Sequence, residues 1–136
     1  RLSDQSFGSP DFTVWDEEAA QEAMNKALNG EKPLDYEVAA YQSLLMDFLG
    51  GEYAARGFTM QLHLGALRNL NTLRFRGLGP DVGCDSIGDG IPAASLAALL
   101  DRLAVRDALP KSILYTLNAS DNEKLIAALR EIITGC

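Results

Sequence analysis

The chain has 136 residues, the size of one ordinary domain or of a part of a larger one. Hydrophobic residues make up 47% and charged residues 23% of it, which excludes a disordered or a collagen-like chain. Its net charge of -7 disfavours nucleic acid as a partner, because phosphate contacts need a basic surface. The apolar runs are far shorter than the roughly 20 residues of a membrane-spanning helix, so we expect no contact with a membrane.

The cysteines and the first residues bear on the cellular compartment. Cys84 and Cys136 are far apart and show no C-x-x-C spacing, which is typical of neither a disulfide framework nor a zinc ribbon. No apolar stretch follows residues 1–4, so a signal peptide is not predicted. A reducing, cytoplasmic setting is the simplest interpretation.

Residues 1–57 are predicted to form a loop followed by a helical insertion. Residues 1–15 lack periodicity and hold Gly and Pro, so a loop is expected there. Alanine and other apolar residues at helical spacing, behind an acidic N-cap, predict a helix over about 16–29. An apolar stripe predicts a second helix over about 35–56. The glycine pair in its middle weakens it by about 1 kcal/mol per Gly relative to Ala and allows a kink.

Residues 58–136 are predicted to form two β/α units. Apolar and polar residues first alternate, which indicates a strand with one buried and one polar face. A long loop rich in glycine follows, of the kind that is usually functional in a compact domain. The later strand is nearly all apolar, which is typical of a strand buried in a parallel sheet. The expected order is strand 58–64, loop 65–91, helix 93–106, strand 112–117 and helix 121–134.

Alternating strands and helices indicate an α/β fold with a parallel sheet. Both a (β/α)8 barrel and a doubly wound sheet fit this pattern, and both bind their ligands at the carboxyl ends of the strands. In this chain those ends carry the polar residues His63 and Asn118. We therefore expect a functional site at that end of the sheet.

His63 is the only histidine of the chain. At a strand end it suits a general acid or base, a metal ligand or a hydrogen-bond partner of a substrate. A structural residue that caps the strand is an equally good interpretation. A catalytic zinc usually needs three protein ligands, and one histidine supplies a single nitrogen. We therefore expect this chain alone to bind no metal.

The loop after His63 holds three arginines and no acidic residue over residues 66–78. Arginine recognises carboxylates and phosphates through paired hydrogen bonds, and the neighbouring Asn and Thr side chains suit hydroxyl groups. A sugar acid would match this mixture. Arg68, the arginine nearest the strand end, is expected to bind the ligand. Arg74 and Arg76 are expected to pair with acidic residues of the same loop, namely Asp81, Asp85 or Asp89.

Several motifs follow one another along the chain, and their combination is more specific than any single one. The first runs from Met60 to Asn69 and includes both His63 and Arg68. The other motifs are Asn71-Thr72, Leu78-Gly79-Pro80-Asp81, Asp85-Ser86-Ile87-Gly88-Asp89, Leu109-Pro110-Lys111, Ile113-Leu114-Tyr115-Thr116-Leu117-Asn118 and Asp121-Asn122-Glu123. Together these motifs resemble the uronate isomerase (glucuronate isomerase) family. The preceding helical pair resembles the family's helical insertion, and residues 1–4 resemble the end of an earlier barrel strand.

The resemblance implies a segment of an amidohydrolase-type (β/α)8 barrel. The family interconverts D-glucuronate with D-fructuronate, and D-galacturonate with D-tagaturonate. A proton moves between C2 and C1 of the open-chain sugar acid, usually with one bound zinc. By this resemblance His63 is the catalytic strand-end histidine and Arg68 is a substrate-binding arginine. The sugar acids are then the expected partners, and a homo-oligomer is the expected assembly.

The chain also departs from the family pattern. A whole barrel takes roughly 200 residues or more. The H-x-H metal pair of the family's first strand and its late-strand Asp are missing, and Gln5 stands where the family tends to have histidine. We therefore expect an internal segment of a uronate isomerase that is inactive in isolation. The alternative is a module that binds a small anion without reacting it, or a purely structural piece.

Overall fold

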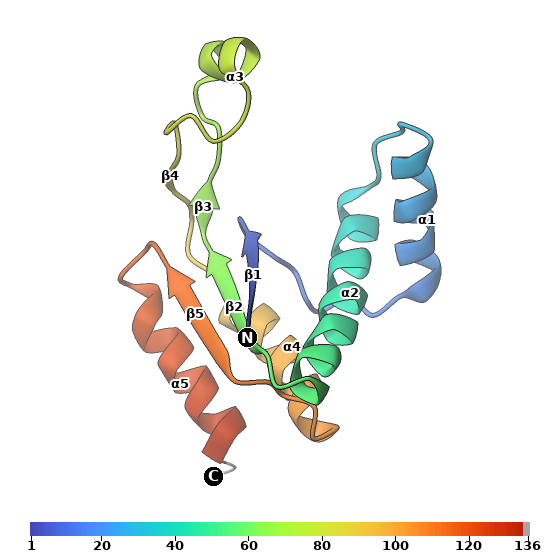
Figure 1. Cartoon of the computed structure of the whole chain (residues 1–136), viewed down its shortest axis with the longest axis vertical. Coiled ribbons are helices and arrows are strands. Elements are labelled where there is room, and N and C mark those ends of the chain that lie inside the picture. The colour runs from blue at the N-terminus through green and yellow to red at the C-terminus, as the bar shows by residue number, and fades with distance from the viewer. Residues whose placement is uncertain (135–136) are drawn as a thin grey trace.

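The computed structural model of the chain describes residues 1–134. Its centre is a parallel sheet of three strands in the order β1-β2-β5. All three strands point the same way, and the carboxyl end of the sheet leads into a projecting arm (Figure 1). The strands are β1 Leu2–Phe7, β2 Thr59–Leu64 and β5 Ser112–Thr116.

The helices agree with the sequence prediction to within one residue at each end, except for a short helix that was not predicted. Asp16 caps the first helix, because its Oδ1 accepts a hydrogen bond of 2.9 Å from the Ala19 N–H. None of the helices described between residues 1 and 134 is both long and apolar enough to cross a bilayer. The helices are α1 Glu17–Leu28, α2 Asp35–Ala55, α3 Thr72–Leu78, α4 Ala93–Val105 and α5 Asp121–Thr134.

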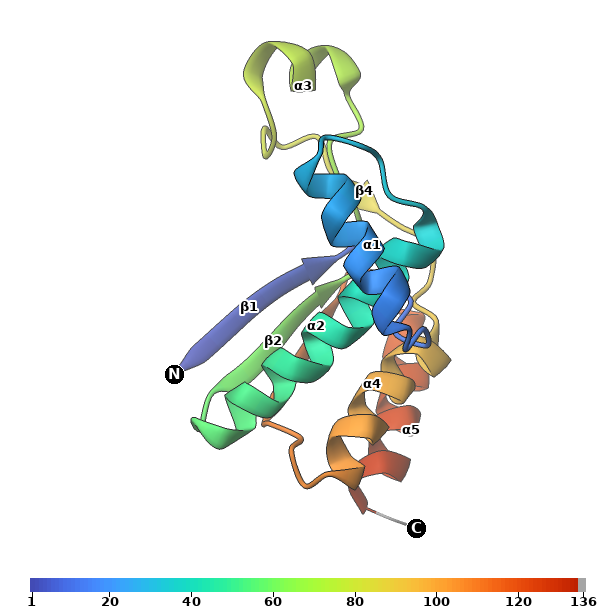
Figure 2. The same ribbon diagram turned by 90° about the vertical axis from the view of Figure 1, so that its right-hand side faces the viewer.

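The arrangement of the helices distinguishes between the two predicted sheet types. The three strands of this sheet lie side by side in the order in which they occur along the chain. Helices α2, α4 and α5 lie on one side of this sheet, and the other side is open (Figure 2). A doubly wound sheet would carry helices on both faces, whereas a barrel wall carries them only outside. The chain therefore has the architecture of a barrel segment.

The first strand corrects the prediction of a loop over residues 1–15. Residues Leu2–Phe7 pair with β2 in parallel register, although four of the six are polar. Weak strand propensity is overridden here by the hydrogen bonds of the neighbouring strand. The family resemblance had indicated a strand that ends at Asp4, whereas β1 continues to Phe7.

The core lies between the covered face of β2 and helix α4. Met60, Leu62 and Leu64 are buried to within 2% of full burial. They form one cluster with four leucines of α4: Leu96, Leu99, Leu100 and Leu103. The polar alternate residues of β2 lie on the open face, so the predicted two-faced strand is confirmed.

Of the two adjacent glycines of α2, only Gly50 serves packing. Helix α2 runs unbroken from Asp35 to Ala55. A Cβ on Gly50 would lie 2.6 Å from Cδ1 of Leu103, whereas a Cβ on Gly51 would meet no atom within 4 Å. Gly50 thus allows α2 and α4 to approach closely. The division of the chain at residue 57 stays a prediction.

Strand β5 is less buried than predicted. Ile113 is 40% and Tyr115 is 41% exposed, because both point to the open face of the sheet. The apolar run had indicated a strand buried on both sides, as in a parallel sheet between two layers. In this chain only one face of the strand is covered.

The loop over residues 65–91 is more ordered than predicted. It contains the two-residue strands β3 Ala66–Leu67 and β4 Ser86–Ile87, which pair in antiparallel fashion, and helix α3 at its tip. Asn71 caps α3 by accepting a hydrogen bond of 3.0 Å from the Arg74 N–H. None of the residues of α3 is buried. We call residues 65–91 the arm; it projects from the carboxyl end of the sheet (Figure 1).

Candidate functional site

The open face of the sheet carries a row of polar side chains. Partners in a parallel register point to the same face, and β2 pairs Gln61 with Asp4 and His63 with Ser6. On the other side, His63 pairs with Tyr115 of β5. Since none of the helices described between residues 1 and 134 covers this face, these groups are available to a ligand (Figure 2).

His63 has two neighbours that hold its ring. Its Nε2 lies 3.1 Å from Oδ1 of Asp4, and its ring stacks on that of Tyr115 with centroids 4.4 Å apart. Residues close to His63 in sequence offered no carboxylate. Asp4 was missed because it reaches His63 only through strand pairing. The pair is suited to proton transfer, since the carboxylate orients the imidazole.

Tyr115 is itself fixed by hydrogen bonds. Its OH donates to Oε1 of Gln61 at 2.8 Å, and Nε2 of Gln61 donates to the carbonyl of Ser3 at 3.2 Å. The ring on which His63 stacks is therefore tied to β2 directly and to β1 through Gln61. These links across the three strands make the face a prearranged surface.

Arg68 lies beside the same strand ends. Its Nη1 donates to Oδ2 of Asp85 at 2.8 Å, and its Nη2 donates to Oγ of Ser6 at 3.1 Å. The expected pairing was therefore wrong: Arg68, and neither Arg74 nor Arg76, pairs with an acidic residue of the arm. Among the described residues, Arg74 and Arg76 form no salt bridge and lie exposed on α3.

Asp85 connects Arg68 to the backbone of the arm. Its second oxygen, Oδ1, accepts a hydrogen bond of 2.9 Å from the Asn69 N–H. This backbone bond, followed by the Arg68 guanidinium, holds the pKa of Asp85 below its usual value of 3.8. Asp85 is thus ionised at neutral pH and keeps both partners.

Asn118, the other residue predicted at a strand end, has a local role. Its Oδ1 accepts hydrogen bonds from the N–H of Ser120 at 3.1 Å and from its Oγ at 2.9 Å. These bonds close the turn before α5. The structure therefore brings His63 and Arg68 to one place and uses Asn118 as a turn residue.

A small cavity joins His63 to Arg68. Its volume is about 80 Å3, and Tyr115 and Ala66 are among the residues that line it. Small-molecule sites usually measure about 300–1,000 Å3. The cavity is therefore too small to enclose a sugar acid. Its lining residues can form only one side of such a site.

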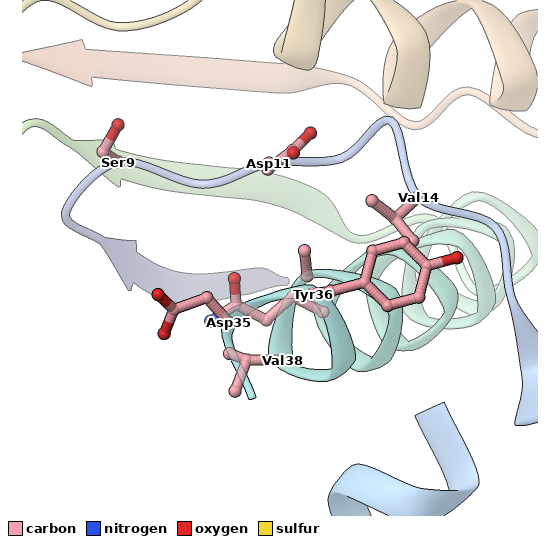
Figure 3. A pocket seen from close by; sticks show the side chains of 8 residues that line it. Ser9, Asp11, Val14, Asp35, Tyr36 and Val38 are labelled. Atoms are coloured by element: carbon pink, nitrogen blue, oxygen red, sulfur yellow. The ribbon is translucent and has the colours of Figure 1, made fainter. Parts of the chain in front are cut away.

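A larger cavity lies elsewhere, between the segment after β1 and the first turns of α2 (Figure 3). Its volume is about 530 Å3, and Ser9, Asp11, Asp35 and Tyr36 are among its lining residues. The lining holds two carboxylates and no basic residue, so it would repel an anion. The strand ends at His63 and Arg68 are the better candidate.

The residues of the site do not fit a metal centre. Between residues 1 and 134 the structure holds no group of three or more His, Cys, Asp or Glu side chains that could bind a metal. Asp4 and His63 offer one oxygen and one nitrogen, whereas catalytic zinc usually has three protein ligands. The expectation that this segment alone binds no metal stays a prediction.

Comparisons with known proteins agree on one family. A family model described as glucuronate isomerase matches residues 1–135. The uronate isomerases of Salmonella newport and Salmonella dublin are each 46% identical to the chain over 126 residues, which cover 92% of it and 27% of each relative. The crystal structure of uronate isomerase from Thermotoga maritima matches 96% of the chain with a TM-score of 0.82 and 29% identity. That match covers 28% of the Thermotoga chain, so the chain spans only about a quarter of the length of these relatives.

Proposed function

The chain belongs to the glucuronate isomerase family, and we propose that it forms one wall of the sugar-acid site of a uronate isomerase. The observation that carries this proposal is the pairing of His63 with Asp4 beside Arg68, on the open face at the carboxyl end of the strands. Ligands of barrels bind at this end. The family match, the fold and the position of these residues support the same reading.

Each residue has a distinct part in the proposed reaction. Arg68 binds the carboxylate of D-glucuronate or D-galacturonate, since its planar fork suits paired hydrogen bonds. His63, oriented by Asp4, exchanges a proton with the reacting end of the open-chain sugar as hydrogen moves between C2 and C1. The products are D-fructuronate and D-tagaturonate. Tyr115 holds the imidazole ring in place by stacking.

The segment lacks the groups that would complete the site. We propose that the zinc implied by the family takes its ligands from outside these residues, because they do not form a metal centre. The 136 residues alone should therefore not turn over uronate. A non-catalytic module that binds a small anion is the alternative function of the isolated chain.

The setting and the partners follow the same reasoning. We propose a cytoplasmic homo-oligomeric enzyme that contacts neither nucleic acid nor membrane. The free thiol of Cys84 suits a reducing compartment, while Cys136 lies outside the described residues. The net charge of -7 disfavours phosphate backbones as partners.

A chimera tests the proposed function. Residues 1–136 replace the matching segment of the Salmonella newport enzyme, and formation of D-fructuronate from D-glucuronate is measured. We expect the chimera to be active, and its His63→Asn variant to lose at least about 100-fold in kcat, the usual contribution of a general acid or base. Gln21→Ala, on the exposed face of α1, is the matched control and should keep the activity of the chimera.

Two outcomes would contradict the proposal. One is a folded chimera, judged by its circular dichroism, that has no isomerase activity. The other is full activity of the His63→Asn chimera. Saturable binding of D-glucuronate by the isolated chain, together with an inactive folded chimera, would favour the anion-binding module.

A further inference from the structure

We propose that Asp85 is a positioning residue, which holds the Arg68 guanidinium in the orientation that receives the carboxylate of the sugar acid. This inference rests on the proposed function, because it assigns the anchor of that site. Asp85 is not among the residues that line the small cavity between His63 and Arg68, so it acts through Arg68. The sequence motif that contains Asp85 also reads as a plain turn signature.

The geometry gives Asp85 two simultaneous tasks. Its Oδ2 accepts from Arg68 at 2.8 Å, and its Oδ1 accepts from the Asn69 N–H at 2.9 Å. Asn69 has a φ of 57°, in the left-handed region that is uncommon for residues other than Gly. The carboxylate thus fixes both the side chain of Arg68 and the backbone of the next residue.

We call the two hydrogen bonds that Asp85 accepts, from Arg68 and from the Asn69 N–H, the clasp. The two sides of the arm are joined by a backbone hydrogen bond close to the clasp. The Gly88 N–H donates to the carbonyl of Gly65 at 2.7 Å, and a Cβ on Gly88 would lie only 2.8 Å from that oxygen. This contact joins the two sides of the arm next to the β3–β4 pair. The backbone that carries Asp85 is therefore fixed by the β3–β4 pair and by this hydrogen bond.

Arg68 retains hydrogen-bonding capacity for a ligand. A guanidinium has five N–H donors, and the two bonds to Asp85 and Ser6 occupy one donor on each terminal nitrogen. The remaining donors suffice for a paired contact with a carboxylate. Asp85 also weakens the positive charge that attracts the anion, so positioning and charge have opposite effects on affinity.

The opposing effects make the experiment decisive. In the chimera, Asp85→Asn removes the charge and disrupts the clasp. If positioning dominates, KM for D-glucuronate rises about tenfold while kcat changes less than threefold. If repulsion between the Asp85 carboxylate and the anionic substrate dominates, KM falls, and the proposal is overturned. Asp89→Asn, an exposed carboxylate of the same arm, is the control and should leave KM unchanged.

A double-mutant cycle separates positioning from general support of the fold. If Asp85 acts through Arg68, then Asp85→Asn should not raise KM further in an Arg68→Ala background. Additive effects of the two changes would contradict the proposal.

NMR on the chimera, isotope-labelled at arginine and asparagine, tests these hydrogen bonds without a measurement of activity. In Asp85→Asn we expect the NMR signal of the Arg68 Nε–H to show a more mobile side chain. The Asn69 amide hydrogen should exchange with solvent at least tenfold faster. Neither change is expected in Asp89→Asn. An unchanged Arg68 signal would overturn the positioning role. If NMR shows that Asp85 holds Arg68 but no chimera is active, the proposed function fails, while the structural role of Asp85 stands.

Discussion

Asp121 is a buried carboxylate that ties the last helix to the segment in front of α4. It is 1% exposed, and its Oδ2 accepts a hydrogen bond of 3.1 Å from the Ile91 N–H. Its Oδ1 accepts from Nζ of Lys124 at 2.9 Å. Lys124 first, and then the backbone N–H, hold the pKa of Asp121 below its usual value of 3.8.

This arrangement predicts a pH-dependent contribution to stability. Because the pKa of Asp121 is lower in the folded state, ionised Asp121 contributes to the free energy of unfolding above pH 3.8. This contribution is lost as the pH falls through the pKa of the folded state. Asp121→Asn should therefore be less stable than the parent at pH 7, and the difference should narrow below about pH 4. Urea unfolding from pH 7 to pH 3 measures this. Glu123→Gln is the control, and its free energy of unfolding should change with pH as that of the parent does. The same pH dependence for Asp121→Asn and the parent would contradict the prediction.

The two adjacent glycines of α2 give a matched test at the level of the helices. A Cβ on Gly50 would press against the Leu103 side chain, whereas Gly51 faces open space. Gly50→Ala should lower the free energy of unfolding by up to about 2 kcal/mol, because overpacking costs about 1–3 kcal/mol and the helix preference of Ala offsets up to about 1 kcal/mol of it. Gly51→Ala should raise it by up to about 1 kcal/mol, because Ala favours the helix. Thermal unfolding of both variants checks the signs, and equal signs would refute close packing at Gly50.

The elements show how far local patterns reach. The helices and β2 were predictable because apolar residues recur at helical or alternating spacing over six residues or more. The arm was not, since its strands have two residues each and its helix has seven. Strand β1 has few apolar residues, and it forms because β2 supplies its hydrogen bonds. Elements that depend on a neighbour leave little signal in their own sequence.

The site shows the same limit at the scale of the whole molecule. His63 and Arg68 were predictable because they follow a clear strand and match a family motif. Their partners Asp4 and Asp85 were not identified in these roles, since the contacts arise from strand pairing and from closure of the arm. Residue types near a strand end thus indicate a site, but its proton partner and its anchor require the fold.

The open face of the sheet should also govern how the isolated chain behaves in solution. Leu2, Ile113 and Tyr115 are between 40% and 64% exposed on that face, and β1 and β5 are unpaired edges of the sheet. Exposed strand edges beside apolar side chains promote association. Light scattering should therefore show a mass above that of the monomer that rises with concentration.

A lysine on the open face should reverse this association. Ile113→Lys places a charge on the exposed face of β5 and should shift the chain towards the monomer, since a charge on an edge strand disfavours pairing. Leu28→Lys changes the net charge equally, but lies at the end of α1, away from the sheet, where Leu28 is 77% exposed. It should leave the association unchanged. Equal effects of the two lysines would show that overall charge, and not the open sheet face, controls self-association.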